Sequence, residues 1–258
     1  RLLGTFPYGR PQDGTSSSIQ NIDFADLIDA KGRFMTADNA TIAVYGNFDR
    51  KLGYRAIRRY FGGWIKSDKK IPATFRQPDA PLPAVLNVVW PKPGAAAIRF
   101  AMRGVARNDK NFAPSMVYTT ILENRLQSRV PAIFADDLFV RNEAYALPGL
   151  IVIGFAAGKR DVGSSNGAIE ANDLVGSALS DPITDAEFRA SKIIVQALWA
   201  KKDAQTFWLD ADTYKTTSPD TDARIADNVK FADVIAYAEK ARKLPIATVL
   251  LNAPPPVK

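Results

Sequence analysis

The side chains that could do chemistry in this chain are carboxylates, lysines, arginines and serines, because its 258 residues include no histidine and no cysteine. This composition excludes a Ser-His-Asp triad, a Cys-His dyad, a His-based zinc peptidase site and any disulfide within these residues. Carboxylates alone suit hard cations better than the zinc of a peptidase. The sequence therefore predicts a chain that binds no catalytic zinc and hydrolyses no peptide by itself.

Two short patterns could still support catalysis or nucleotide binding. Ser67 and Lys70 have the Ser-x-x-Lys spacing that brings a hydroxyl and an amine together on one helical turn. Nothing in the surrounding sequence indicates the burial that lowers a lysine pKa, so an exposed helix end is the better interpretation. The stretch 158–165 has the glycine spacing of a phosphate-binding loop, but Ser164 stands where the essential lysine belongs. A plain strand-to-helix turn is favoured there.

A basic stripe is predicted on a helix near the N-terminus, in a chain with 34 basic and 27 acidic residues and a net charge of +7. On the expected helix 50–61, the basic residues at i, i+4, i+7 and i+8 share one face. They are Lys51, Arg55, Arg58 and Arg59. One interpretation is a solvated face opposite a core face of Tyr54, Ile57 and Phe61. The alternative is an anion-binding surface for nucleic acid or anionic lipid, although the chain has no recognisable nucleic-acid module.

The first 70 residues are expected to fold as loop, helix, strand and helix. Asp23 and Asp26 suit a helix start, the first as the cap and the second near the positive end of the helix dipole. Residues 41–45 are expected to form a short strand, and Asp49 to cap the next helix. The chain opens without methionine or a signal region, as a piece of a longer precursor would. We therefore expect strand 41–45 to lie at the edge of a separate sheet that a missing partner leaves partly uncovered.

Prolines mark a connector, placed at 71–84, between the end of one domain (1–70) and a second domain (85–258). The second domain is predicted to be α+β, with one mostly antiparallel sheet covered by helices on one face. The almost wholly apolar run 150–157 predicts a central strand. The expected strands are 85–90, 97–104, 138–144, 150–157 and 246–251, and the clearest helices are 111–129, 166–179, 185–202 and 231–242.

The helix expected from residue 185 has a clear local signal. Thr184 and Glu187 form a capping-box pattern at its start. Its predicted core face consists of Phe188, Val195 and Leu198.

An offset of 207 residues exposes a repeat within the chain. Residues 24–28, Phe-Ala-Asp-Leu-Ile, correspond to residues 231–235, Phe-Ala-Asp-Val-Ile. At the same offset, residues 40–42, Ala-Thr-Ile, correspond to residues 247–249, Ala-Thr-Val. A match of both a helix start and a strand at one offset favours a structural duplication over two unrelated amphipathic units.

The opening residues carry an ordered series of short motifs. These are Phe6-Pro7-Tyr8-Gly9-Arg10-Pro11, Gly14-Thr15, Ser18-Ile19, the helix start at Asp23, Asp38-Asn39-Ala40-Thr41 and Val44-x-Gly46-Asn47-Phe48-Asp49. The series resembles the second half of a pitrilysin/insulinase-type zinc metallopeptidase unit, in which His-Pro-Tyr-Gly usually stands where this chain has Phe-Pro-Tyr-Gly. The similarity extends over nearly the whole chain, and the first 50 residues carry most of its specificity.

The resemblance implies duplicated α+β half-units, like those of mitochondrial processing peptidase, that close around an extended peptide. The family's catalytic motif, His-x-x-Glu-His with a further Glu, belongs to a domain upstream of the matched region. The resemblance thus implies an inactive domain that forms one wall of a peptide-binding chamber and pairs with a catalytic domain or subunit, as a homo- or hetero-dimer. It implies no cofactor in this chain, and zinc in the missing upstream domain or in the partner subunit. Bacterial members imply a periplasmic or secreted location.

Two arginines are singled out by the same resemblance. Active members use an Arg and a Tyr seven residues apart in the non-catalytic half to hold and polarise the substrate carbonyl. Here Arg129 meets Asp136 and Arg141 meets Pro148, which argues against that auxiliary catalytic role. Arg129 and Arg141 still flank the region of the substrate contacts, so they are the candidate substrate-binding residues. A surface ion pair is the alternative role for either.

Overall fold

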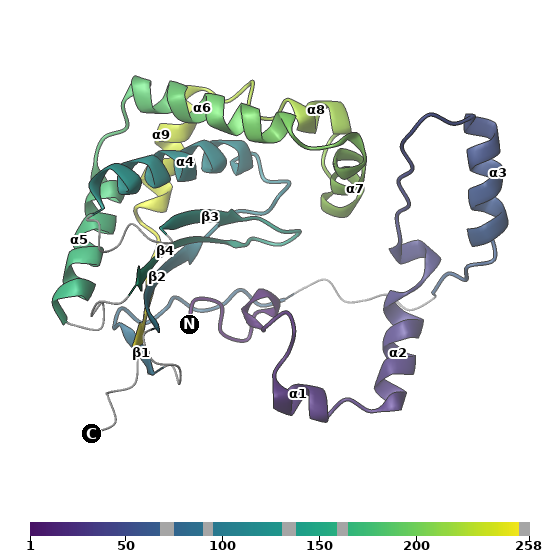
Figure 1. Cartoon of the computed structure of the whole chain (residues 1–258), viewed down its shortest axis with the longest axis horizontal. Helices are drawn as coiled ribbons and strands as arrows, with labels where there is room; N and C mark the ends of the chain where they lie inside the picture. The colour runs from purple at the N-terminus through teal and green to yellow at the C-terminus, as the bar shows by residue number, and fades with distance from the viewer. Residues whose placement is uncertain (68–74, 90–94, 131–137, 159–164, 253–258) are drawn as a thin grey trace.

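The computed structural model of the chain describes residues 1–67, 75–89, 95–130, 138–158 and 165–252 (Figure 1). Its centre is a five-stranded sheet with the strand order β1-β5-β2-β4-β3. Neighbouring strands are antiparallel except β1 and β5, which are parallel. The expected mostly antiparallel sheet is confirmed, and the apolar run forms β4, an interior strand paired on both sides. The strands are β1 (Leu86–Val89), β2 (Ala95–Arg103), β3 (Phe139–Glu143), β4 (Leu150–Gly158) and β5 (Ala247–Asn252).

Helices cover one face of the sheet, as expected for the α+β class (Figure 1). α4 (Phe112–Arg129) packs against β3, and it also contacts α5 (Ser165–Ser180), α6 (Asp185–Ala200) and α9 (Phe231–Ala241). The sequence indicated a mainly helical C-terminal stretch but gave no bounds for α7 (Ala204–Tyr214) and α8 (Pro219–Ala223). Their apolar residues are too few to form a clear stripe, and on α7 only Phe207 is buried. Within the described residues, none of the helices combines the length and the apolar character needed to cross a bilayer.

The side chains of the central strands alternate between the two faces of the sheet. Residues between the buried positions, such as Arg99 on β2 and Val152 on β4, point to the opposite face, which we call the open face. The helix-facing residues form the main core: Ile98, Phe100, Met102, Ile151, Ile153 and Phe155.

Residues 1–9, here called the N-terminal arm, cover part of the open face. Leu2, Leu3 and Phe6 are buried in a small cluster with Ala247 of β5. The arm includes the short 3-10 helix η1 (Pro7–Gly9). This second core fixes the arm to the sheet, because the buried apolar side chains would be exposed to water if it detached.

Residues 16–66, here called the N-terminal unit, lie away from the sheet (Figure 1). They contain α1 (Ser16–Gln20), α2 (Phe24–Phe34), the 3-10 helix η2 (Ala37–Asn39) and α3 (Arg50–Phe61). None of these elements has a buried residue. The predicted caps are confirmed: the Asp23 carboxylate accepts from the Asp26 N–H at 2.9 Å, and the Asp49 carboxylate accepts from the Leu52 N–H at 2.7 Å.

Two sequence-based expectations are corrected by the structure. Residues 41–45 are extended but pair with none of the described strands, because no sheet edge lies beside them. They lie against α7 instead, where the Thr41 hydroxyl donates to the Asp212 carboxylate. On α6 the capping box of Thr184 and the burial of Phe188 and Val195 are confirmed, but Leu198 is 54% exposed, because at that end of the helix its neighbour Trp199 faces inward and packs on Phe112.

The internal repeat is visible in the helix boundaries. α2 and α9 are both 11-residue helices, and adding 207 to the bounds of α2 gives those of α9. In each, the third helical residue is an aspartate, Asp26 or Asp233, whose carboxylate accepts from the N–H of the N-cap residue. The extended residues 41–45 correspond to residues 248–252 of β5. The two segments thus share local structure, although only the second lies in a sheet.

Candidate functional site

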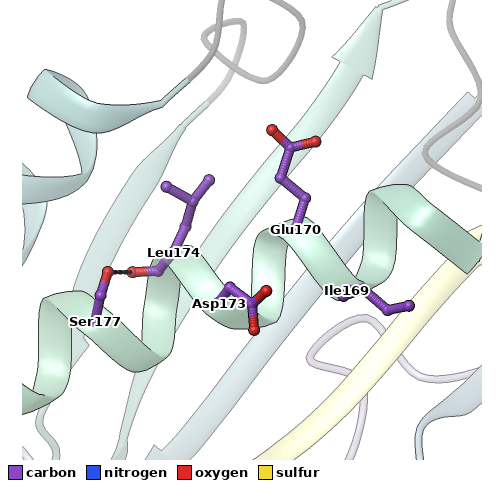
Figure 2. A pocket seen from close by; sticks show the side chains of 5 residues that line it. All are labelled: Ile169, Glu170, Asp173, Leu174 and Ser177. Atoms are coloured by element: carbon purple, nitrogen blue, oxygen red, sulfur yellow. Dashed lines mark hydrogen bonds between the residues drawn. The ribbon is translucent and has the colours of Figure 1, made fainter.

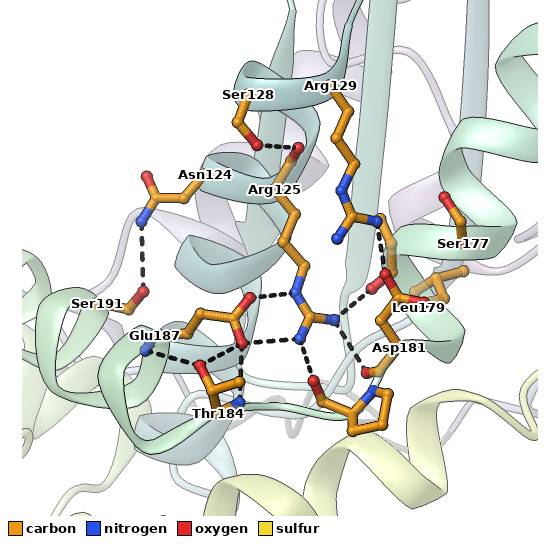
Figure 3. A network of polar contacts seen from close by, with 12 residues as sticks. Asn124, Arg125, Ser128, Arg129, Ser177, Leu179, Asp181, Thr184, Glu187 and Ser191 are labelled. Carbon is orange, nitrogen blue, oxygen red and sulfur yellow. Dashed lines mark hydrogen bonds and ion pairs between the residues drawn. The ribbon is translucent and has the colours of Figure 1, made fainter.

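The C-terminal end of α4, where the sequence directs attention to substrate contacts, contains a structural network around Arg125 (Figure 3). Arg125 is only 5% exposed and uses all five of its N–H donors. Its Nε and Nη2 donate to Glu187 at 2.6 and 3.0 Å. The other bonds go to the carbonyls of Ala178, Asp181 and Pro182. Arg125 therefore fixes the turn between α5 and α6 onto α4 and has no donor left for a ligand.

Glu187 belongs to the same network and is strongly stabilised as a carboxylate. The hydrogen bond from Arg125 lowers the pKa of Glu187 to about 2, and hydrogen bonds from the N–H and hydroxyl of Thr184 contribute in the same direction. The carboxylate also raises the pKa of Arg125. Both groups stay charged at neutral pH, as a structural ion pair requires.

Arg129, one of the two predicted substrate-binding residues, lies one turn further along α4 (Figure 3). Its Nη1 is 2.7 Å from the Asp181 carboxylate, and both side chains are partly exposed. This contact is the surface ion pair that the sequence offered as the alternative role. Substrate binding by Arg129 would have to break it.

Arg141, the other predicted residue, lies on β3 with its side chain on the open face. Its guanidinium carbon is 4.3 Å from the centroid of the Phe139 ring, and that of Arg99 on β2 is 4.9 Å from the same centroid. The expected alternative, an ion pair, is not found: in the described part of the chain, Arg141 has no carboxylate partner. The structure thus places a cation–aromatic cluster, Arg99–Phe139–Arg141, on the open face.

Gly154 on β4 explains how this cluster bridges three strands. Phe139 pairs with Gly154 in the ladder, and Arg99 pairs with Gly154 from the other side. A Cβ at position 154 would lie 2.3 Å from the Phe139 ring, so only glycine leaves room for the ring to lie across β4. Sequence reasoning missed Arg99 and Phe139. The alternation of Arg99 with buried Ile98 and Phe100 is the signal that could have found them.

The predicted basic stripe is present on α3. Lys51, Arg55, Arg58 and Arg59 are all exposed. The expected core face is not buried, since Tyr54 is 67% exposed and Phe61 is also exposed. The reason is that no other helix or strand of the described residues packs extensively against α3, although the Phe48 ring from the preceding loop lies close, at Gly53. The solvated basic face is therefore present, but the apolar residues opposite it do not form a core face with the described residues.

Other candidate sites offer little convergent chemistry. The Ser67 N–H donates to the Asp38 carboxylate at 3.0 Å, while Lys70 and residues 159–164 of the glycine-containing loop lie outside the described residues. An open hollow of about 560 Å³ on α5 contains Glu170 and Asp173, which point away from each other (Figure 2). The described residues contain no group of three or more acidic side chains arranged to hold a metal ion.

Comparison with known families identifies the class of protein. The family model described as the peptidase M16 inactive domain matches residues 21–194. Because the match covers more than half of the chain, the chain belongs to this family. A domain of this family is not catalytic by itself, which agrees with the sequence-based expectation and with the resemblance to the pitrilysin type. No curated protein sequence is similar enough to the chain to count as a relative.

Solved structures share the fold at low sequence identity. A peptidase M16 inactive domain from Pseudomonas fluorescens has a TM-score of 0.80 at 20% identity, covering 100% of this chain and 64% of that one. A chain of complex III from Candida albicans has a TM-score of 0.71 at 18% identity, covering 97% and 64%. The periplasmic protease PqqL from Escherichia coli has a TM-score of 0.60 at 13% identity, covering 93% and 29%. This chain thus spans 64% or less of each of these structures.

Proposed function

We propose that this chain is the non-catalytic half of an M16-type peptidase assembly, which pairs with a catalytic domain or subunit and forms one wall of a peptide-binding chamber. Zinc would be held by that partner and not by this chain, whose residues include no histidine or cysteine. Family membership supports the non-catalytic part of the proposal. The pairing is supported by the surface of the N-terminal unit.

The observation that carries the pairing is the difference in burial between α2 and its repeat counterpart α9. Leu27 on α2 is 57% exposed, whereas Val234 at the equivalent position of α9 is fully buried. Phe34 is likewise exposed where its counterpart Ala241 is buried. α9 gains this burial by packing on α4 and α6. The exposed apolar face of α2, with apolar residues at equivalent positions, would be covered in the same way by a partner that packs helices against it.

The extended residues 41–45 indicate that the partner also has a sheet edge with which they can pair. Their counterpart β5 lies between β1 and β2, paired with a strand on each side. An unpaired extended segment with exposed Ile42 and Val44 therefore fits a place in the sheet of the partner. The partner proposed here is an α/β half-domain with an open sheet edge and an apolar helix beside it.

Reconstitution with a catalytic M16-type domain from the same organism tests the pairing. The full chain and a partner that contains His-x-x-Glu-His are coexpressed, and complex formation is measured by size-exclusion chromatography together with cleavage of fluorogenic peptides. We expect a complex that is lost in Leu27→Asp and retained in Leu198→Asp, a matched exposed leucine on α6. Separate elution of the two wild-type chains, or equal loss in both variants, would contradict the proposal.

The basic stripe supports a second candidate function, binding of a polyanion. All four basic side chains of the stripe are exposed, and no ion pair to them is found in the described residues. Retention of the full chain on heparin, measured from low to high salt, should then fall steeply with salt concentration. The double variant Arg55→Glu/Arg59→Glu should abolish retention. Unchanged retention in that variant would remove this candidate.

A further inference from the structure

We infer that the outer edge of β3, together with the open-face side chains of that strand, forms a subsite for an extended peptide with alternating basic, acidic and apolar residues. The inference rests on the proposed function, in which this sheet faces a peptide chamber. It goes further by naming the side chains that select the peptide and the pattern that they select.

β3 is the last strand of the sheet, and none of the described residues pairs with its outer edge. Every second residue of such an edge directs its N–H and C=O away from the sheet. An extended peptide can add there as a further strand, gaining affinity from the main chain and specificity from alternate side chains. The opposite edge strand, β1, contributes no charged side chain, because its residues are Leu86, Asn87, Val88 and Val89.

The open-face side chains of β3 form an ordered row of Phe139, Arg141 and Glu143. The register places these three residues opposite Gly154, Val152 and Leu150 of β4, which are all on the open face. Successive members of the row therefore present an apolar ring, a cation and an anion. The cross-strand distance in a sheet is about 5 Å between Cβ atoms, so each would contact one residue of an added strand.

Charge complementarity defines the residue opposite Arg141. Arg141 is exposed, and together with Arg99 it places two guanidinium groups against the same Phe139 ring. An acidic side chain on the added strand would relieve the repulsion between these like charges and form a cross-strand ion pair. The N-terminal arm lies at the Glu143 end of the row, where its Tyr8 ring packs on Tyr145 with centroids 4.7 Å apart, and it leaves Arg141 exposed.

The neighbouring positions complete the pattern. Glu143 accepts a hydrogen bond from the Tyr145 hydroxyl at 3.2 Å, which fixes its carboxylate and favours a lysine or arginine opposite it. Phe139 favours an apolar or aromatic residue. An antiparallel peptide therefore reads Lys-x-Glu-x-Phe, and a parallel peptide reads Phe-x-Glu-x-Lys.

Peptide binding to the full chain tests the subsite. Fluorescein-labelled peptides with threonine at the x and flanking positions are measured by fluorescence anisotropy, one in each direction. We expect the better of the two to bind about fivefold more tightly than the same peptide with Glu replaced by Lys. Arg141→Glu should reverse this preference. Two N-methylated peptides are compared, one methylated at the odd-numbered nitrogens and one at the even-numbered nitrogens. Only one of them should lose binding, because only one of the two sets of N–H groups faces β3.

A matched variant separates a local contact from the overall charge. Arg189→Glu makes the same charge change at an exposed site on α6 and should leave the peptide preference unchanged. Equal effects of Arg141→Glu and Arg189→Glu, or equal binding of the Glu and Lys peptides, would overturn the subsite. Coelution with the catalytic partner is measured on the same variants and should not change. Absence of the Glu-over-Lys preference in the wild-type chain, with intact coelution, would refute the subsite alone, whereas absence of coelution of the wild-type chain would refute the proposed function.

Discussion

The two repeated segments, residues 24–45 and 231–252, have similar sequences and similar local structure. They differ in burial, since the first is mostly exposed and the second contributes to the core. Both helices contain 11 residues and have an aspartate at the third helical position that accepts from the N-cap N–H. α2 has no buried residue, whereas Val234, Tyr237, Ala238 and Ala241 of α9 are all buried. The comparison teaches that capping and periodicity define a helix, while burial depends on what the rest of the assembly packs against it.

The largest expected difference between the two segments comes from placing a charge at equivalent positions. Val234→Asp puts a carboxylate into a fully buried site and should destabilise the chain by about 4 kcal/mol or more. Leu27→Asp should change the free energy of unfolding by no more than about 0.5 kcal/mol, because Leu27 is already exposed. Urea denaturation followed by circular dichroism measures both. A large effect of Leu27→Asp in the isolated chain would mean that α2 is covered in solution.

Removal of an ion pair should lower the free energy of unfolding more in the domain that contains the five-stranded sheet, here called the sheet domain, than in the N-terminal unit. Arg125→Ala leaves Glu187 and three carbonyls without their partner and should cost about 3 kcal/mol. Arg33→Ala removes an exposed pair with Asp29 on α2 and should cost at most about 0.5 kcal/mol. Thermal unfolding of the two variants checks the ranking. Similar losses of stability would show that the two ion pairs are equally important.

A pH dependence of stability is expected from Glu187 in the Arg125 network. The folded-state pKa of Glu187 is lowered to about 2 from its usual 4.5, so its contribution is complete above pH 4.5 and is lost as the pH falls toward 2. Solvent screening of this partly exposed group reduces the contribution to about 1–2 kcal/mol. Denaturant midpoints between pH 5 and pH 2 should fall less steeply in Glu187→Gln. The exposed control Glu170→Gln should keep the wild-type slope, and an identical slope in all three proteins would refute this assignment.

The smallest expected effect is local and concerns the cap of α2. Asp23→Ala removes the acceptor of the Asp26 N–H and should destabilise α2 by about 1 kcal/mol, without changing global unfolding. Amide hydrogen exchange should therefore accelerate in α2 and remain unchanged in α9. Lys230→Ala serves as the control, because the Lys230 side chain makes no cap hydrogen bond. Acceleration in both helices would indicate that the two segments unfold together.

Much of the fold was predictable because its signals are local or periodic. The caps at Asp23, Asp49 and Thr184 follow from residue type and spacing, and the apolar run 150–157 identified the central strand. Leu198 and residues 41–45 were misjudged for a common reason. Their patterns are those of buried elements, but burial requires a neighbour, and the sequence around them does not say whether one is present.

The site was less predictable than the fold. Arg141 was found only through the resemblance. Its contact with Phe139 depends on the absence of a side chain at Gly154, the residue of the neighbouring strand that pairs with Phe139. Arg129 and Arg141 looked equivalent in the sequence. Whether an arginine is paired, like Arg129, or left facing outward depends on the loop that lies opposite, here the turn containing Asp181.

Besides its contact with α7, the N-terminal unit is attached to the rest of the chain where it leaves and where it returns. The rings of Phe6 and Phe75, which flank that unit in sequence, have centroids 6.5 Å apart, and Arg1 donates to the carbonyl of Ala84 at 2.6 Å. The unit is thus a double tether that leaves the open face and returns to it. A partner docked on this unit would therefore be held at a high effective concentration beside the sheet.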